Sequence, residues 1–333
     1  MKKFLFTLFP IVLALFVSLM PFKAESSQYP HGDFTWNYTT EINDLTVLID
    51  GLMKGDVKWY YDLNWDFSID INDVTCMVDY LLSGEWYIPN YGPEILDSAE
   101  VFTVNGVTFA MMPVEGCESY DLFKDGTAVV SLKDYYMGQT EVTQALWKAV
   151  MGDDSRNPCS VLFYHGDPQH PVDMVSWFEC RDFITRLNEL TGRHFHLPTA
   201  AQWIYAAQGG KYTHGYLYSG SNDLDEVGWY MYDHPYEDSF DITFPVGLKA
   251  PNELGLYDMS GNVREWTRNT IAREGDALPD LSEYDNLYEK GPAYGGVSSD
   301  PDYYCRTTVA RLTYRGQSAP MYGFRLALQK EEQ

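Results

Sequence analysis

The chain has 333 residues, enough for two domains, and 45% of them are hydrophobic, so a sizeable core can form. Its 48 acidic residues outnumber the 23 Lys and Arg residues, which gives a formal net charge of -25. Because this charge repels phosphate backbones, we expect no nucleic-acid partner. The acidic side chains either face water or bind hard cations such as calcium.

Residues 1–24 have the pattern of an export signal. Lys2 and Lys3 precede an apolar run from Phe4 to Met20, and a short polar stretch follows. The run is short for a membrane anchor and contains Pro10, and no later segment is apolar enough to span a bilayer. We therefore expect a secreted protein, periplasmic or extracellular, with no membrane span once the signal is removed.

An internal repeat follows, in which segments beginning at Asp33 and Asp62 align with an offset of 29 residues. In the second copy, oxygen-bearing residues stand at positions 1, 3, 5, 9 and 12 of a calcium loop, with a carbonyl at position 7. These residues are Asp62, Asn64, Asp66, Asp70 and Asp73, with the carbonyl of Ser68. Their counterparts in the first copy are Asp33, Thr35, Asn37, Glu41 and Asp44, with the carbonyl of Thr39. The first loop carries fewer charges and should bind calcium more weakly.

Each loop runs into an apolar pattern with the spacing of an amphipathic helix. The apolar positions are Leu45, Leu48, Ile49 and Leu52 in one copy, and Val74, Met77, Val78 and Leu81 in the other. Two loop–helix repeats over residues 29–86 resemble the dockerin module, which in its family docks a carrier protein onto a cohesin partner. The resemblance implies a small all-α module with two calcium sites and a cohesin-type scaffold protein as partner. Position 6 departs from the Gly of calcium loops, holding Tyr38 and Phe67. The alternative is a two-helix acidic module whose carboxylates face water.

Residues 87–100 form a predicted linker, and a large domain occupies residues 101–333. Its short apolar stretches are often broken by Gly, Asn and Pro, with one clear helix candidate from Trp177 to Leu190. This pattern favours an α+β fold rich in loops.

Several segments of the large domain, in order, resemble the sulfatase-modifying factor family, whose best-known member is the formylglycine-generating enzyme. They include TEVTQALW, HLPTAAQWIYAA, GLYDMSGNVREW and YGFRLAL. The resemblance implies a C-type-lectin-like fold with bound calcium. By similarity, the side chains of Asp258 and Glu265 and the carbonyls of Gly261 and Val263 match the family's calcium site. Two carboxylates that flank a turn can also converge on a cation on general grounds. The remaining motif residues are interpreted as fold determinants: Glu141, Thr143, Trp177, Trp203 and Trp266.

The family's enzymes hold copper(I) with two thiolates that follow a Gly pair. In this chain Asp300 stands where the first thiolate is expected and Cys305 where the second is expected. A carboxylate is a hard ligand and replaces a thiolate on copper(I) poorly. Cys305 therefore has three interpretations. It is a catalytic candidate left from a copper site, half of a disulfide with Cys117, Cys159 or Cys180, or a buried thiol.

These departures favour a non-catalytic or altered member that binds a glycan or a protein ligand. The many tyrosines suit stacking on sugars or a protein interface: Tyr284, Tyr288, Tyr294, Tyr303, Tyr304, Tyr314 and Tyr322. The alternative is a formylglycine-generating oxidase that converts a sulfatase cysteine to formylglycine. Calcium is the expected cofactor, and copper belongs only to the oxidase alternative.

Overall fold

The computed structural model describes residues 34, 40–56, 61, 63, 69–84, 93–152, 168–231, 243–269 and 290–330. The predicted signal, residues 1–24, lies outside them. The chain divides into two compact units, one from Met1–Asn90 with Leu162–Asp167 and one from Tyr91–Val161 with Pro168–Gln333. Within the described residues, no helix has the length and apolar character needed to cross a membrane.

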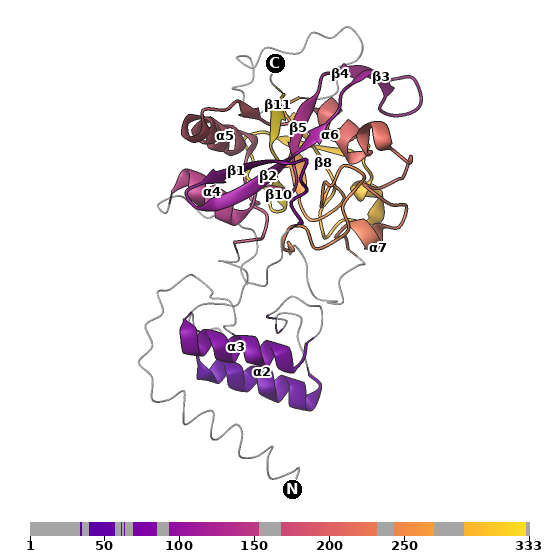
Figure 1. Ribbon diagram of the computed structural model, residues 1–333. Helices are drawn as coiled ribbons and strands as arrows, with labels where there is room; N and C mark the ends of the chain where they lie inside the picture. The colour runs from indigo at the N-terminus through magenta and orange to yellow at the C-terminus, as the bar shows by residue number, and fades with distance from the viewer. Residues whose placement is uncertain are drawn as a thin grey trace. The chain divides into compact units, whose positions relative to one another are not determined.

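The first unit contains two helices of 13 residues, α2 (Ile42–Lys54) and α3 (Ile71–Ser83), as the apolar spacing predicts. Each helix begins with a capping box and ends before a glycine in the left-handed region, Gly55 or Gly84. The helices lie side by side (Figure 1) and bury their apolar faces against each other. The buried positions include Leu45, Leu48, Val74, Met77 and Leu81.

The two sequence repeats of the first unit make the same hydrogen bonds at equivalent positions. The Asp44 carboxylate accepts hydrogen bonds from the backbone N–H groups of Phe34 and Glu41, both at 2.8 Å. At positions 29 residues later, Asp73 accepts from Leu63 at 2.7 Å and from Asp70 at 2.8 Å. Both carboxylates are fully buried. Through these hydrogen bonds each one links the N-terminus of its helix to the segment before it.

The second unit is a mixed, loop-rich α/β fold built on three sheets. The largest is antiparallel, with the order β1-β2-β5-β11-β6. Its strands are β1 (Glu100–Val104), β2 (Val107–Val114), β5 (Tyr135–Gly138), β11 (Ala327–Gln329) and β6 (Phe195–His196). The strands β3 (Cys117–Asp121) and β4 (Val129–Leu132) form a separate hairpin.

A four-stranded sheet with the order β10-β7-β8-β9 carries Arg264 and Glu265 on its strand β7. Its strands are β10 (Tyr322–Gly323), β7 (Arg264–Trp266), β8 (Lys290–Tyr294) and β9 (Ala310–Tyr314). Only the β10–β7 pair is parallel among the described pairs of this sheet. The edge strand β9 leaves Leu312 and Tyr314 exposed.

The helices of the second unit cover the sheets. They are α4 (Gln144–Met151), α5 (Trp177–Thr191), α6 (Ala200–Ala207) and α7 (Leu224–Val227), with 3-10 turns at Gly210–Tyr212 and Asp302–Cys305. The helix predicted from Trp177 extends one residue further, to Thr191, and Gly192 ends it in the left-handed region. Helix α4 packs against α5 and β2 (Figure 1), and the rings of Trp147 and Phe183 stack with centroids 5.3 Å apart.

Replacing Asp73 should weaken α3 more than replacing an exposed carboxylate of the same helix. Asp73→Ala removes the acceptor for two backbone N–H groups, which costs about 1–3 kcal/mol. Amide hydrogen exchange of α3 peptides in calcium-free buffer measures the effect, with Asp79→Ala as the matched control. Equal exchange in the two variants would contradict the capping role.

Candidate functional site

A fully buried ion pair joins Arg325 to Glu265 at the centre of the second unit. The Arg325 Nη2 and Nε atoms lie 2.7 Å from the Glu265 Oε1 and Oε2 atoms respectively, and neither side chain has any exposed surface. The indole N–H of Trp203 donates to Glu265 Oε2, also at 2.7 Å. Both carboxylate oxygens of Glu265 are therefore held by charged or ring N–H donors.

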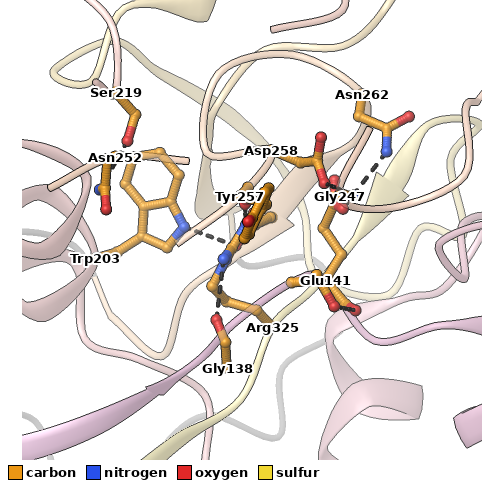
Figure 2. A network of polar contacts seen from close by, with 12 residues as sticks. Gly138, Glu141, Trp203, Ser219, Gly247, Asn252, Tyr257, Asp258, Asn262 and Arg325 are labelled. Carbon is orange, nitrogen blue, oxygen red and sulfur yellow. Dashed lines mark hydrogen bonds and ion pairs between the residues drawn. The ribbon is translucent and has the colours of Figure 1, made fainter. Parts of the chain in front are cut away.

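The same guanidinium ties two further backbone segments to the pair. Arg325 Nη1 donates to the carbonyl of Gly138 at 3.1 Å, and Nη2 donates to the carbonyl of Tyr257 at 2.8 Å. Figure 2 shows this network around Arg325, with Gly138 and Tyr257 on different segments. A single arginine thus holds β5, the loop before β7, and the C-terminal segment in one arrangement.

Two more carboxylates, Glu141 and Asp258, lie in the same buried cluster, each 2% exposed. Asp258 Oδ2 accepts a hydrogen bond of 2.6 Å from the Gly247 N–H, and Glu141 Oε2 lies 3.5 Å from Asn262 Nδ2. Glu141 Oε1 and Asp258 Oδ1 have no hydrogen-bond partner in the described part of the chain. Burial raises the pKa of Glu141 well above its usual value, and Asp258 and Glu265 raise that pKa further. Burial raises the pKa of Asp258 to about 6.

The structure brings together part of the calcium set implied by the family resemblance. Asp258 and Glu265 share the buried cluster, but Glu265 already binds Arg325 and Trp203. The backbones of Gly261 and Val263 lie in the turn between them, and both residues are buried. In the described ranges, no group of three or more His, Cys, Asp or Glu side chains is arranged to hold a metal ion.

Most of the calcium ligands predicted for the first unit lie outside the described residues: Asp33, Thr35, Asn37, Thr39, Asp62, Asn64, Asp66 and Ser68. Of the four that are described, Asp44 and Asp73 cap the helices. Asp70 Oδ1 accepts from the N–H of Asn72 at 2.7 Å, and Glu41 Oε1 accepts from the Asn43 amide at 2.8 Å. These four residues have local structural contacts, and their role as calcium ligands stays a prediction.

Asp300 forms a second buried ion pair, with Arg264 of β7. The two side chains are 10% and 7% exposed, and Asp300 Oδ2 also accepts from the Val297 N–H at 3.0 Å. The sequence predicted the loss of a thiolate at this position but not its new partner. One feature of the sequence indicates that a partner exists. Arg264 stands beside Glu265 in a short strand, and a buried arginine needs a carboxylate to pair with.

Cys305 is a fully buried thiol at the end of the 3-10 turn. It packs in a cluster with Tyr218 and Leu224, and burial, helped by the charge of Asp300, raises its pKa well above the usual value. The thiol is therefore neutral at physiological pH. A Cβ atom added at Gly296, where φ is 76°, would lie 2.8 Å from the Cys305 sulfur, so the backbone is tightly packed there.

The disulfide interpretation of Cys305 is wrong for two of its three candidate partners. Cys305, Cys117 and Cys180 all carry free thiols. Cys159 lies outside the described residues. Among the three interpretations, the buried-thiol interpretation agrees with the packing of Cys305.

The residues at this position do not fit a copper(I) ion. Copper(I) prefers soft thiolate ligands, whereas the chain offers one neutral, buried thiol and one carboxylate that already pairs with an arginine. Coordination by Asp300 would compete with its ion pair and leave Arg264 buried without its carboxylate.

An exposed surface lies on the same segment as Cys305. Tyr303 and Tyr304 are 52% and 37% exposed, and the Arg311 guanidinium lies 5.9 Å from the Tyr304 ring centroid. We call these three residues the tyrosine surface. Tyr314 on β9 is also exposed, at 48%, and lies 5.3 Å from the Lys290 ammonium group. Of the other predicted tyrosines, Tyr294 and Tyr322 are buried, and Tyr284 and Tyr288 lie outside the described residues.

An open pocket of about 510 Å³ adjoins the packing around Cys305. Its lining residues are Tyr218, Asn222, Asp223, Leu224, Tyr230 and Asp302. The Tyr218 hydroxyl donates to the Asp302 carboxylate at 3.2 Å, and the Tyr230 hydroxyl donates to Asp225 at 2.5 Å. The pocket therefore combines aromatic walls with negative charge.

Removing the central arginine should destabilise the second unit strongly. Arg325→Met leaves Glu265 buried without its cation, which costs about 3–5 kcal/mol of unfolding free energy. Urea denaturation followed by near-ultraviolet circular dichroism measures the loss. Arg186→Met, at an exposed position of α5, is the matched control and should change stability little.

Comparison with known proteins agrees with this architecture. The sequence profile of the sulfatase-modifying factor enzyme 1-like domain matches residues 94–330. The chaperone protein LppX of Paenibacillus barcinonensis is 35% identical over 233 residues, covering 56% of this chain and 76% of that protein. The bovine (Bos taurus) formylglycine-generating enzyme is 29% identical over 193 residues, covering 52% of this chain but only 47% of the enzyme.

Among solved structures, Treponema denticola variable protein 1 has a TM-score of 0.57 and 26% identity, covering 71% of this chain and 100% of that one. CarF has a TM-score of 0.52 at 24% identity, which supports the fold alone. From the profile match and the LppX relative together, the chain belongs to the sulfatase-modifying factor enzyme 1-like family.

Proposed function

We propose that this chain is a binding member of its family without formylglycine-generating oxidase activity. The observation that carries the proposal is the buried ion pair between Asp300 and Arg264, which stands where the first copper thiolate is expected. The second position, Cys305, holds a neutral thiol with no exposed surface. The oxidase would need two soft ligands at this place, and the chain supplies one sulfur.

The ion pair with Arg264 explains why position 300 holds a carboxylate. Arg264 is 7% exposed, so removing its carboxylate would leave a nearly buried charge unpaired. The carboxylate and the arginine form a self-contained unit that stabilises β7 and the turn at Val297. In this proposal a position used for metal chemistry in the enzymes serves packing in this chain.

The proposed binding surface comprises the tyrosine surface and the acidic pocket beside Cys305. Exposed aromatic rings provide contact area with little conformational entropy to lose, and they suit either sugars or proteins. A protein ligand is favoured by the 35% identity to a relative named as a chaperone protein. A glycan remains the alternative ligand.

For the first unit we propose an exported assembly module of the dockerin type, with calcium in its loops and a cohesin-type scaffold as partner. Support comes from the contacts of Asp44 and Asp73, which repeat at the sequence offset of 29 residues. Such a module requires two loop–helix repeats, and the two described helices have equivalent lengths and capping contacts. Secretion rests on the signal pattern of residues 1–24.

A direct test of the oxidase alternative uses the purified mature protein with copper, dioxygen, reductant and a Cys-x-Pro-x-Arg peptide. We expect no change in peptide mass, alongside an active family enzyme that converts the same peptide. Asp300→Cys provides two sulfur ligands, at positions 300 and 305, and should raise copper(I) affinity at least tenfold. The control Asp300→Ser removes the carboxylate without adding sulfur and should not raise the affinity.

Formation of formylglycine by the unaltered protein, and its loss in Cys305→Ser, would overturn the proposal. Equal copper(I) affinity in Asp300→Cys and Asp300→Ser would show that the missing thiolate is not what separates this chain from the enzymes.

Calcium binding by the first unit is tested by titration calorimetry of the full mature chain. Asp66→Ala removes the predicted oxygen ligand at position 5 of the second loop and should eliminate one calcium site. Asp79→Ala, on the exposed side of α3, is the control and should leave the stoichiometry unchanged. Unchanged stoichiometry in Asp66→Ala would contradict the loop assignment.

A further inference from the structure

We propose that the edge strand β9 binds an extended segment of a partner protein as an added β-strand, and that acidic and apolar residues alternate in this segment. The proposed partner rests on the proposed function, because β9 carries Arg311 of the tyrosine surface. It narrows the protein ligand of that surface to one kind of chain segment.

Strand β9 (Ala310–Tyr314) forms an open edge of its sheet. Among the described residues it pairs with β8 alone, from Lys290 opposite Tyr314 to Tyr294 opposite Ala310. In an antiparallel pair, alternate residues direct their N–H and C=O groups away from the partner strand. These groups repeat about every 7 Å along the strand, a spacing that the backbone of another β-strand matches. The edge therefore suits a peptide better than a sugar chain.

Both faces of β9 carry exposed side chains. Successive residues of a strand point to opposite faces, so Arg311 lies on one face and Leu312 and Tyr314 lie on the other. Leu312 is 56% exposed and Tyr314 is 48% exposed. A leucine and a tyrosine that are neighbours on one face of an edge strand provide an apolar contact for a side chain of an added strand.

This edge of the sheet is cationic, although the chain as a whole carries a formal net charge of -25. Arg311 and Lys290 are exposed, and the rings that they contact are Tyr304, with its centroid 5.9 Å away, and Tyr314, with its centroid 5.3 Å away. Because a tyrosine ring carries no net charge, both cations retain a full positive charge for an acidic ligand.

The two faces of β9 together define the side-chain pattern of the partner. Residues of an added strand that lie on the face of Arg311 meet a cation, which favours aspartate or glutamate. Residues on the other face lie beside Leu312 and Tyr314, which favours apolar side chains. Cross-strand pairs of opposite charge and of apolar residues each stabilise a sheet, and a slip of one residue would exchange the two faces.

The same charges disfavour a second copy of this chain at the edge. Pairing of two β9 strands would bring Arg311 and Lys290 of both copies to one place, and like charges across a strand pair are destabilising. The strand has the sequence ARLTY, which supplies no carboxylate to compensate.

The probe is a fluorescein-labelled peptide of about eight residues in which Glu and Val alternate, long enough to cover β9. Three control peptides carry Lys in place of Glu, the same Glu and Val residues in two blocks, or an N-methyl group on every residue. The last of these has no backbone N–H donor for a sheet. Fluorescence anisotropy with the full mature chain gives the dissociation constant, and amide hydrogen exchange reports whether β9 becomes protected.

We expect the alternating acidic peptide to bind and to slow amide exchange in β9. Arg311→Glu should weaken binding by about tenfold or more, because an attraction becomes a repulsion. Leu312→Thr removes an apolar contact and should weaken binding by about threefold or more. The matched controls are Arg186→Glu on α5 and Val129→Thr on β4, both at exposed positions, and they should leave the dissociation constant unchanged.

Strand addition is wrong if the unaltered chain does not bind the alternating peptide. It is also wrong if the block or N-methylated peptide binds equally well, since charge or composition alone would then explain the affinity. A concentration-dependent dimer that Leu312→Thr abolishes, measured by sedimentation, would assign the edge to a second copy instead.

These outcomes are separate from a failure of the proposed function. Formylglycine formation is read from the mass of a different peptide, and it would overturn the non-catalytic proposal whether or not β9 binds a strand. Conversely, loss of strand addition leaves the ion pair of Asp300 and Arg264 and its consequence for copper unchanged.

Discussion

The bidentate ion pair between Arg325 and Glu265 is the interaction on which the second unit depends. Strand β7 supplies Glu265 and the C-terminal segment supplies Arg325. Helix α6 donates a hydrogen bond to Glu265 through Trp203, and β5 accepts one from Arg325 through the Gly138 carbonyl. Because both side chains are fully buried, neither charge has water as an alternative partner. The segments can pack only in the arrangement that brings the two charges together.

Strand β7 carries two such pairs on opposite faces. Neighbouring residues of a strand point to opposite sides, so Glu265 faces Arg325 while Arg264 faces Asp300. All three residues of the strand are buried, and one short strand therefore anchors both the central cluster and the turn that presents Cys305. The segment around Asp300 and the central buried cluster are therefore connected through one strand.

Features set by neighbouring residues were predictable from the sequence, and those set by distant residues were not. The helices of the first unit follow from apolar spacing and the 29-residue repeat, and α5 ends at Gly192 as a helix commonly does. The partner of Arg325 is 60 residues away and that of Asp300 is 36 residues away, so a local pattern can indicate that a buried charge needs a partner but cannot identify that partner. Asp73 illustrates a second difficulty, since the same aspartate satisfies both a calcium-loop pattern and a capping box.

Gly296 is a position where packing alone requires a glycine. Any side chain there would collide with the sulfur of Cys305 and with the carbonyl of Tyr304, 2.8 Å and 2.9 Å from the added carbon, and the positive φ adds strain. These steric demands exist whether or not a metal is bound nearby. The glycine pair therefore does not by itself distinguish an oxidase from a chain without the two thiolates, and the residue to inspect is the one four positions later, Asp300.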